Sequence, residues 1–243
     1  MDIAGKRALV FGGSSGIGLA AARQLKALGA TVVVASRNPT DASRLVSSSD
    51  LDGIKTVHCD VTNEEAVKKV CDDEAPLDIL ISSATGGPRA MGPFLEMDLD
   101  GYKGSFAKLW GYANVVRWGG PQVRAGGAVV LVSGAPARGP KAGQVSLSTV
   151  GASVEQLVRC VAPELAAKNV RINAVSPGMI ETPMFGAAGA ERSQRLASAT
   201  SATLIPRPGT DDEAAHAILF AVQNTYITGT TVDVDGGWLA KHS

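Results

Sequence analysis

The most chemically informative residues lie near the amino terminus, where positions 12–18 read GGSSGIG. Glycines at this spacing let the chain turn sharply, and a position without a Cβ lets a pyrophosphate approach the backbone N–H groups. When a helix starts in the turn, the positive end of its dipole also faces the phosphates. The pattern therefore predicts that the chain binds a dinucleotide through Gly12, Ser14, Ser15, Gly16, Ile17 and Gly18.

Two residues at the end of the second predicted strand bear on the identity of the nucleotide. A site that prefers NAD carries an acidic residue there, which accepts hydrogen bonds from the ribose hydroxyls and repels a 2′-phosphate. This chain instead has Ser36 followed by Arg37, whose planar guanidinium group suits a phosphate. A solvated surface arginine is the alternative interpretation, but the missing acid and the present base together favour NADP(H).

Apolar, strand-like runs alternate with helical patterns along the chain, and these elements must position the residues above. Strands are predicted at Ala8–Phe11, Thr31–Ala35, Lys55–His58, Asp78–Ser82, Ala128–Ser133, Arg171–Ser176 and Thr230–Val234. Helices are predicted at Leu19–Leu28, Glu64–Asp73, Phe106–Val123, Val150–Lys168 and Asp211–Gln223. Most strand runs are apolar throughout, as in parallel strands that are covered on both faces. The pattern predicts an α/β fold, a doubly wound parallel sheet in a single domain over residues 1–243.

Two details of the predicted helix Val150–Lys168 carry their own expectations. Ser148 and Thr149 precede this helix, and their hydroxyl groups are expected to cap its amino terminus. Pro163 lies inside the same helix, where a proline removes one backbone hydrogen bond. A kink or a local break is therefore expected at Pro163.

Composition excludes several classes of partner. The chain has 23 basic and 23 acidic residues among 243, so its charge gives no reason to expect nucleic acid or an anionic membrane as a partner. No apolar run is long enough to span a bilayer, and no signal-peptide pattern is present, so a cytoplasmic location is expected. Cys59, Cys71 and Cys160 are isolated, which predicts neither a disulfide framework nor a metal site.

Further short motifs follow the glycine turn along the chain. They are Asp60-Val61, Ser82-Ser83-Ala84-Thr85, Val170–Gly178, Thr182-Pro183-Met184, Ile227-Thr228-Gly229 and Asp235-Gly236-Gly237. With these motifs the chain resembles the short-chain dehydrogenase/reductase family over nearly its whole length, although Phe11 stands where that family usually has a threonine before the glycine turn. The resemblance implies a Rossmann fold and further cofactor contacts from Asp60, Val61, Ser83, Ala84, Thr85, Pro177, Gly178, Ile180 and Thr182.

The resemblance also shows where the family's catalytic residues would lie. In that family a tyrosine exchanges the substrate proton and a lysine four residues later assists it, but the matching positions here are Leu147 and Gly151. No shift of alignment restores the pair, because the three tyrosines are at positions 102, 112 and 226 and none lies in the required interval. The family's serine falls at Gly134, directly after Ser133, and its asparagine falls near Lys108.

Three functions are compatible with this sequence. The first is an NADP(H)-dependent oxidoreductase that acts on a small carbonyl or enone by an unusual mechanism, with Ser133 as the candidate catalytic residue and Lys108 as a residue that could stabilise an alkoxide. The second is a non-catalytic nucleotide-binding sensor or scaffold that descends from reductases. The third is a non-redox enzyme, such as a cyclase, isomerase or dehydratase, in the same pocket. The resemblance also implies a homodimer or homotetramer.

Overall fold

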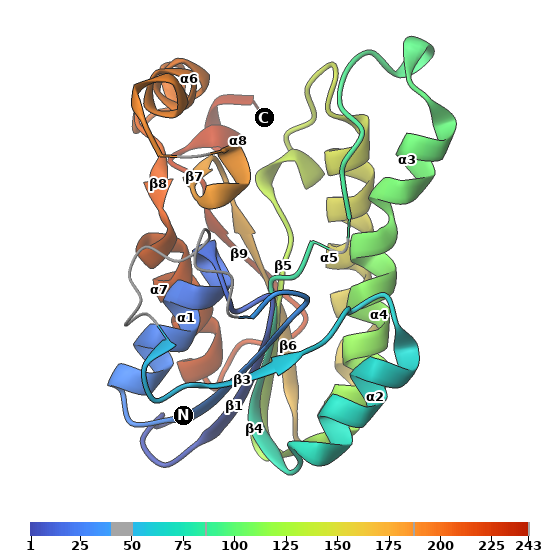
Figure 1. Cartoon of the computed structure of the whole chain (residues 1–243), viewed down its shortest axis with the longest axis vertical. Coiled ribbons are helices and arrows are strands. Elements are labelled where there is room, and N and C mark those ends of the chain that lie inside the picture. The colour runs from blue at the N-terminus through green and yellow to red at the C-terminus, as the bar shows by residue number, and fades with distance from the viewer. Residues whose placement is uncertain (40–50, 86, 187, 243) are drawn as a thin grey trace.

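Seven parallel strands form the central sheet (Figure 1). The computed structural model describes residues 1–39, 51–85, 87–186 and 188–242. The strands of the sheet are β1 Arg7–Phe11, β2 Thr31–Ser36, β3 Lys55–His58, β4 Leu77–Ser82, β5 Val123–Val132, β6 Arg171–Pro177 and β9 Thr231–Val234. Their order is β3-β2-β1-β4-β5-β6-β9, so the chain moves outward from β1 and then returns to add β4 on the other side. This reversal leaves a crevice at the carboxyl ends of β1 and β4.

Helices cover both faces of the sheet (Figure 1). On one face lie α1 Gly16–Ala27 and α7 Asp211–Gln223; on the other lie α2 Glu64–Asp73, α4 Ala107–Gly119 and α5 Val145–Ala166. Leu9 and Phe11 of β1 pack in the core that contains α4 and α5, whereas Val10 packs in the core that contains α1 and α7. This alternation explains why the strand is apolar throughout, because both of its faces are buried. The predicted doubly wound parallel sheet is confirmed.

Shorter elements lie around the carboxyl edge of the sheet. They are α3 Leu99–Ser105, α6 Ala190–Thr200, α8 Trp238–His242 and the two-stranded sheet of β7 Ile180–Glu181 and β8 Gly209–Thr210. None of these was among the predicted elements. All but α6 are seven residues or shorter, too short to show a clear hydrophobic period. In α6 only Leu196 and Thr200 are buried, so its sequence carries no apolar stripe that would predict a helix. No helix within the described ranges is both long and apolar enough to cross a membrane.

Helix α5 differs from its prediction at the amino terminus. It begins at Val145 rather than near Val150, so Ser148 and Thr149 lie inside the helix and the prediction that they cap it was wrong. The Thr149 hydroxyl group donates instead to the Val145 carbonyl oxygen, at 2.8 Å. Bonding back to the preceding turn is the usual way for a threonine to satisfy its hydroxyl group within a helix.

Pro163 does not end helix α5, which continues to Ala166. The proline is exposed and lies in the last turns of the helix. Because a proline has no N–H group, the Arg159 carbonyl oxygen receives no hydrogen bond from residue 163. The predicted local break is absent from this helix.

Candidate functional site

A cavity of about 490 Å³ opens at the carboxyl edge of the sheet, where the strand order reverses. It is lined by almost all of the residues predicted to bind a cofactor: Gly12, Ser14, Ser15, Gly16, Ile17, Gly18, Ser36, Arg37, Val61, Ser83, Ala84, Thr85, Pro177, Gly178, Ile180 and Thr182. Asp60 lies beside the cavity between two lining residues, Cys59 and Val61. The sequence motifs therefore come together in one place.

The glycine turn packs too closely against the rest of the edge to accept side chains. A Cβ at Gly12 would lie 2.6 Å from the backbone nitrogen of Ala84, and one at Gly18 would lie 2.3 Å from both the Gly12 carbonyl oxygen and Ser83 Oγ. The Ser83 hydroxyl group also donates to the Gly12 carbonyl oxygen at 3.2 Å. This packing fixes the turn against the segment after β4 and leaves the amino terminus of α1 facing the cavity.

The far end of the cavity has a hydroxyl pair and a cation at the end of β2. Ser14 Oγ and Ser36 Oγ are 2.7 Å apart, and the exposed side chain of Arg37 follows directly. Although partial burial opposes it, the hydrogen bonds from Thr62 and the charges of Arg37 and His58 lower the pKa of Asp60. No carboxylate stands at the end of β2 itself, where an acid would repel a phosphate.

The carboxyl-terminal segments close the cavity on the side of the second small sheet. Thr182 is buried and lies close to the glycine turn, since a Cβ at Gly16 would be 3.1 Å from Thr182 Cγ2. Trp238 of α8 lines the cavity as well, and its indole N–H donates to the Gly139 carbonyl oxygen at 3.3 Å. Lys141 Nζ lies 3.6 Å from the centre of the Trp238 ring, a cation–π contact that holds this wall in place.

Ser133 lines the cavity directly after β5, but its hydroxyl group is already engaged. Ser133 Oγ donates to Glu155 Oε1 at 3.0 Å and lies 3.2 Å from the Gly151 carbonyl oxygen. Glu155 is buried on α5 and also contacts Arg138 Nε at 3.0 Å. A ligand oxygen would have to compete with this carboxylate for the single proton of Ser133.

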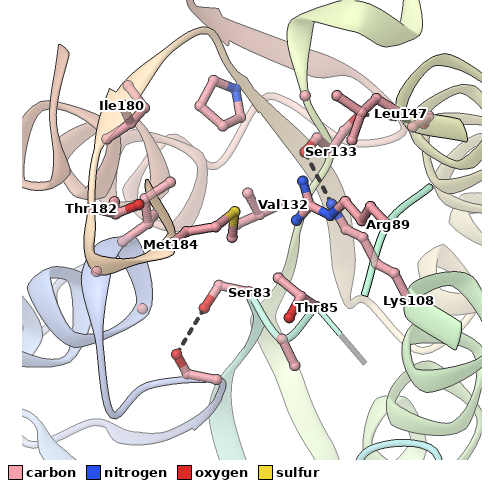
Figure 2. A pocket seen from close by; sticks show the side chains of 18 of the residues that line it. Ser83, Thr85, Arg89, Lys108, Val132, Ser133, Leu147, Ile180, Thr182 and Met184 are labelled. Atoms are coloured by element: carbon pink, nitrogen blue, oxygen red, sulfur yellow. Dashed lines mark hydrogen bonds between the residues drawn. The ribbon is translucent and has the colours of Figure 1, made fainter. Parts of the chain in front are cut away.

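Helix α5 carries Leu147 and Gly151 at the two positions that the sequence analysis singled out. Leu147 is half-buried and lines the cavity (Figure 2). Gly151 lines the cavity one helical turn later. A Cβ at Gly151 would lie 3.0 Å from Ala137 Cβ and 3.5 Å from Ser133 Oγ. The three tyrosines lie elsewhere: Tyr102 OH donates to Thr149 Oγ1, Tyr112 OH donates to the Val132 carbonyl oxygen, and Tyr226 is exposed.

The wall opposite Thr182 carries two cations (Figure 2). Lys108 of α4 is buried, and its ammonium group donates to the Ser133 carbonyl oxygen at 3.1 Å. Arg89, in the connection between β4 and α3, is half-buried and lines the same cavity. Burial and the neighbouring Arg89 charge lower the pKa of Lys108 well below its usual value. Sequence analysis singled out Lys108 but missed Arg89, because a lone arginine in an irregular connection carries no periodic or motif signal.

Comparisons with known proteins agree with this geometry. The family model described as enoyl-(acyl carrier protein) reductase matches residues 12–239. The bovine (Bos taurus) L-xylulose reductase is 34% identical over 247 residues, covering 99% of each chain. The 3-oxoacyl-(acyl-carrier-protein) reductase FabG of Thermotoga maritima is 30% identical over 250 residues, covering 98% of this chain and 99% of the relative. A small-chain dehydrogenase solved in complex with NADPH superposes with a TM-score of 0.80 at 26% identity, covering 97% of this chain and 99% of the other.

Proposed function

The chain belongs to the short-chain dehydrogenase/reductase family, and on that premise we propose that it transfers a hydride between NADP(H) and a small carbonyl or enone substrate. The observation that carries the proposal is the single cavity in which the glycine turn, Arg37 and the Pro177–Thr182 segment meet at the carboxyl edge of the sheet. Relatives named as reductases and neighbours solved with NADPH support the same reaction class.

The residues of the cavity fit NADP(H) on steric grounds. Only glycine leaves space at positions 12 and 18, since a Cβ at either position would lie within 2.6 Å of a neighbouring atom. The backbone N–H groups at the start of α1 would hold the pyrophosphate, and Arg37 would hold the 2′-phosphate. The segment from Pro177 to Thr182 would hold the nicotinamide, which when bound donates or accepts the hydride.

We further propose that proton transfer departs from the family's usual scheme. Leucine and glycine at positions 147 and 151 have no proton to exchange at the pH of the reaction. Ser133 remains the candidate that contacts a substrate oxygen, because rotation of its hydroxyl group moves its proton from Glu155 toward the cavity. A positioned general acid contributes on the order of 10²–10⁴ in rate. The chain is therefore expected to favour substrates that are already activated or that carry their own proton source.

The proposed activity is tested with NADPH and a panel of ketones and enones. We expect at least one activated carbonyl compound to oxidise NADPH and to be reduced by two electrons in the same reaction. Substitution of Ser133 by alanine should lower the rate without changing NADPH affinity, because Ser133 contacts the substrate rather than the phosphates.

A second candidate function is a non-catalytic nucleotide sensor, and the specific observation in its favour is Leu147 together with Gly151 in the cavity wall. Tight NADPH binding without oxidation by any carbonyl of the panel would favour the sensor over the reductase. Turnover that is lost on substitution of a cavity residue would exclude the sensor.

The cofactor preference gives a separate prediction at Arg37. Replacement of Arg37 by alanine should weaken NADPH binding about 10–100-fold, because a charge-assisted hydrogen bond to the 2′-phosphate is lost. NADH affinity should be unchanged, since NADH lacks that phosphate. Calorimetric titration with both nucleotides measures the two affinities, and Arg117→Ala on the exposed side of α4 serves as the matched control. An equal loss for NADPH and NADH would show that Arg37 does not read the 2′-phosphate.

A further inference from the structure

We propose that Arg89 and Lys108 form a binding site for an oxyanionic group of the substrate, a carboxylate or a phosphate. The inference rests on the proposed reductase function and names the substrate class: a small carbonyl compound that carries a negative charge. Its starting point is a pair of cations in the wall of the cavity, next to Ser133 (Figure 2).

The first step is that neither cation has a negative partner within the described part of the chain. Lys108 has only 7% of its surface exposed. Its ammonium group contacts the neutral Ser133 carbonyl oxygen and the Tyr112 ring, 5.4 Å from Nζ to the ring centre. The ion pairs among the described residues include neither Lys108 nor Arg89. A buried ammonium group is costly unless it is paired, so this arrangement is incomplete without an anion.

The second step is that Arg89 raises the free-energy cost of the buried Lys108 ammonium group rather than lowering it. Burial and the nearby Arg89 charge both lower the pKa of Lys108, and burial also lowers the pKa of Arg89. Two like charges in a poorly solvated wall repel each other, and an anion between them converts that repulsion into two attractions. Guanidinium and ammonium groups together offer the donors that a carboxylate or a phosphate accepts.

The third step concerns which anion occupies the site. The phosphates of the cofactor belong to the opposite wall, where Gly16 and the start of α1 lie against Thr182. Figure 2 shows Thr182 across the cavity from Lys108, while Arg89 and Lys108 lie beside Ser133 and Leu147. Ser133 follows β5 at the edge where open α/β sheets bind their ligands. The two cations therefore face the substrate and not the cofactor phosphates.

The experiment measures substrate binding separately from turnover. Protein loaded with NADP⁺, which has no hydride to give to a carbonyl, is titrated with two matched pairs: acetoacetate against methyl acetoacetate, and dihydroxyacetone phosphate against dihydroxyacetone. We expect the charged member of at least one pair to bind about 10–100-fold more tightly than the neutral one. The pair that discriminates identifies the anion as carboxylate or phosphate.

Variants assign the discrimination to the two cations. Arg89→Met and Lys108→Met should each remove about tenfold or more of the preference for the charged ligand. Arg89→Lys, which keeps the charge, should retain part of the preference. Lys103→Met on the exposed surface of α3 and Arg117→Met on α4 are the matched controls and should leave the preference intact. A loss of NADPH affinity in Arg89→Met or Lys108→Met would assign the pair to the cofactor and overturn the proposal.

The outcomes separate this proposal from the proposed function. Equal affinity within both ligand pairs overturns the oxyanion site, whether or not NADPH is oxidised. Charge-dependent binding without NADPH oxidation supports the oxyanion site and counts against the reductase. Turnover of neutral carbonyls whose kcat, but not KM, falls in Arg89→Met and Lys108→Met would show that the cations stabilise a developing alkoxide, which also overturns a ground-state anion site.

Discussion

Replacement of Gly18 by alanine should lower the free energy of unfolding by about 3 kcal/mol and abolish measurable NADPH binding. The added Cβ would lie 2.3 Å from the Gly12 carbonyl oxygen and 2.3 Å from Ser83 Oγ, which is far inside van der Waals contact. Either the turn or the segment after β4 must move, and both line the proposed cofactor site. Denaturant unfolding measures the stability, and calorimetric titration measures the affinity.

The matched control for Gly18 is Gly104, which is also a helical glycine. A Cβ at Gly104 has no neighbour within 4 Å, and the residue is exposed on α3. Gly104→Ala should therefore leave NADPH affinity unchanged and raise stability by up to about 1 kcal/mol through helix propensity. If Gly18→Ala bound NADPH as tightly as the parent protein, the glycine turn would not be the phosphate site.

Replacement of Lys108 by methionine should stabilise the protein without ligand by about 1–3 kcal/mol at neutral pH. Methionine matches the length of the aliphatic stem, and it removes an ammonium group that has no counter-ion among the described residues. The gain is reduced by about 1 kcal/mol because the Ser133 carbonyl oxygen loses its donor. The control is Lys103→Met, whose side chain is 85% exposed and should change stability little.

The stabilisation by Lys108→Met should also depend on pH. Because the pKa of Lys108 is lower in the folded state than its usual value of 10.5, the unfolded state binds more protons between those two values. The penalty from the native lysine is complete below the folded-state pKa and disappears as the pH rises toward about 10.5. The difference in free energy of unfolding between the two proteins should therefore shrink as the pH rises. A difference that is independent of pH would show that the Lys108 ammonium group is not destabilised by folding.

The regular parts of the molecule could be predicted from sequence because their physical signals are local. The apolar runs around Val10 and Val130 predict buried parallel strands, and both residues are buried. The glycine turn predicts that a ligand approaches the backbone closely. The sheet and its parallel pairing followed from these signals, whereas most of the cavity lining was predicted from the resemblance to the short-chain dehydrogenase/reductase family. Cofactor contacts by individual residues, and the role of Ser133, remain predictions.

The substrate side could not be predicted, because its contacts join segments that are distant in sequence. Glu155 accepts a hydrogen bond from the Ser133 hydroxyl group, 22 positions earlier in the chain, yet in the sequence it is only a carboxylate between Val154 and Gln156 of a helix. Arg89 lies in an irregular connection, so no spacing rule brings it to Lys108. The start of α5 was misplaced because Ser148 and Thr149 resemble capping residues. The helix already begins at Val145, and in its first turn Ser146 is buried and its hydroxyl group donates to the Ala90 carbonyl oxygen.

The close packing around Gly151 limits how the cavity wall can be redesigned. Any side chain at this position starts 3.0 Å from Ala137 Cβ, so Ala137 must shift by a few tenths of an ångström to accept it. A lysine at position 151 would strain the contact with Ala137. A tyrosine at position 147 alone would lack a neighbouring lysine. Redesign of this wall toward a tyrosine–lysine pair would thus require combined changes at Ala137, Leu147 and Gly151.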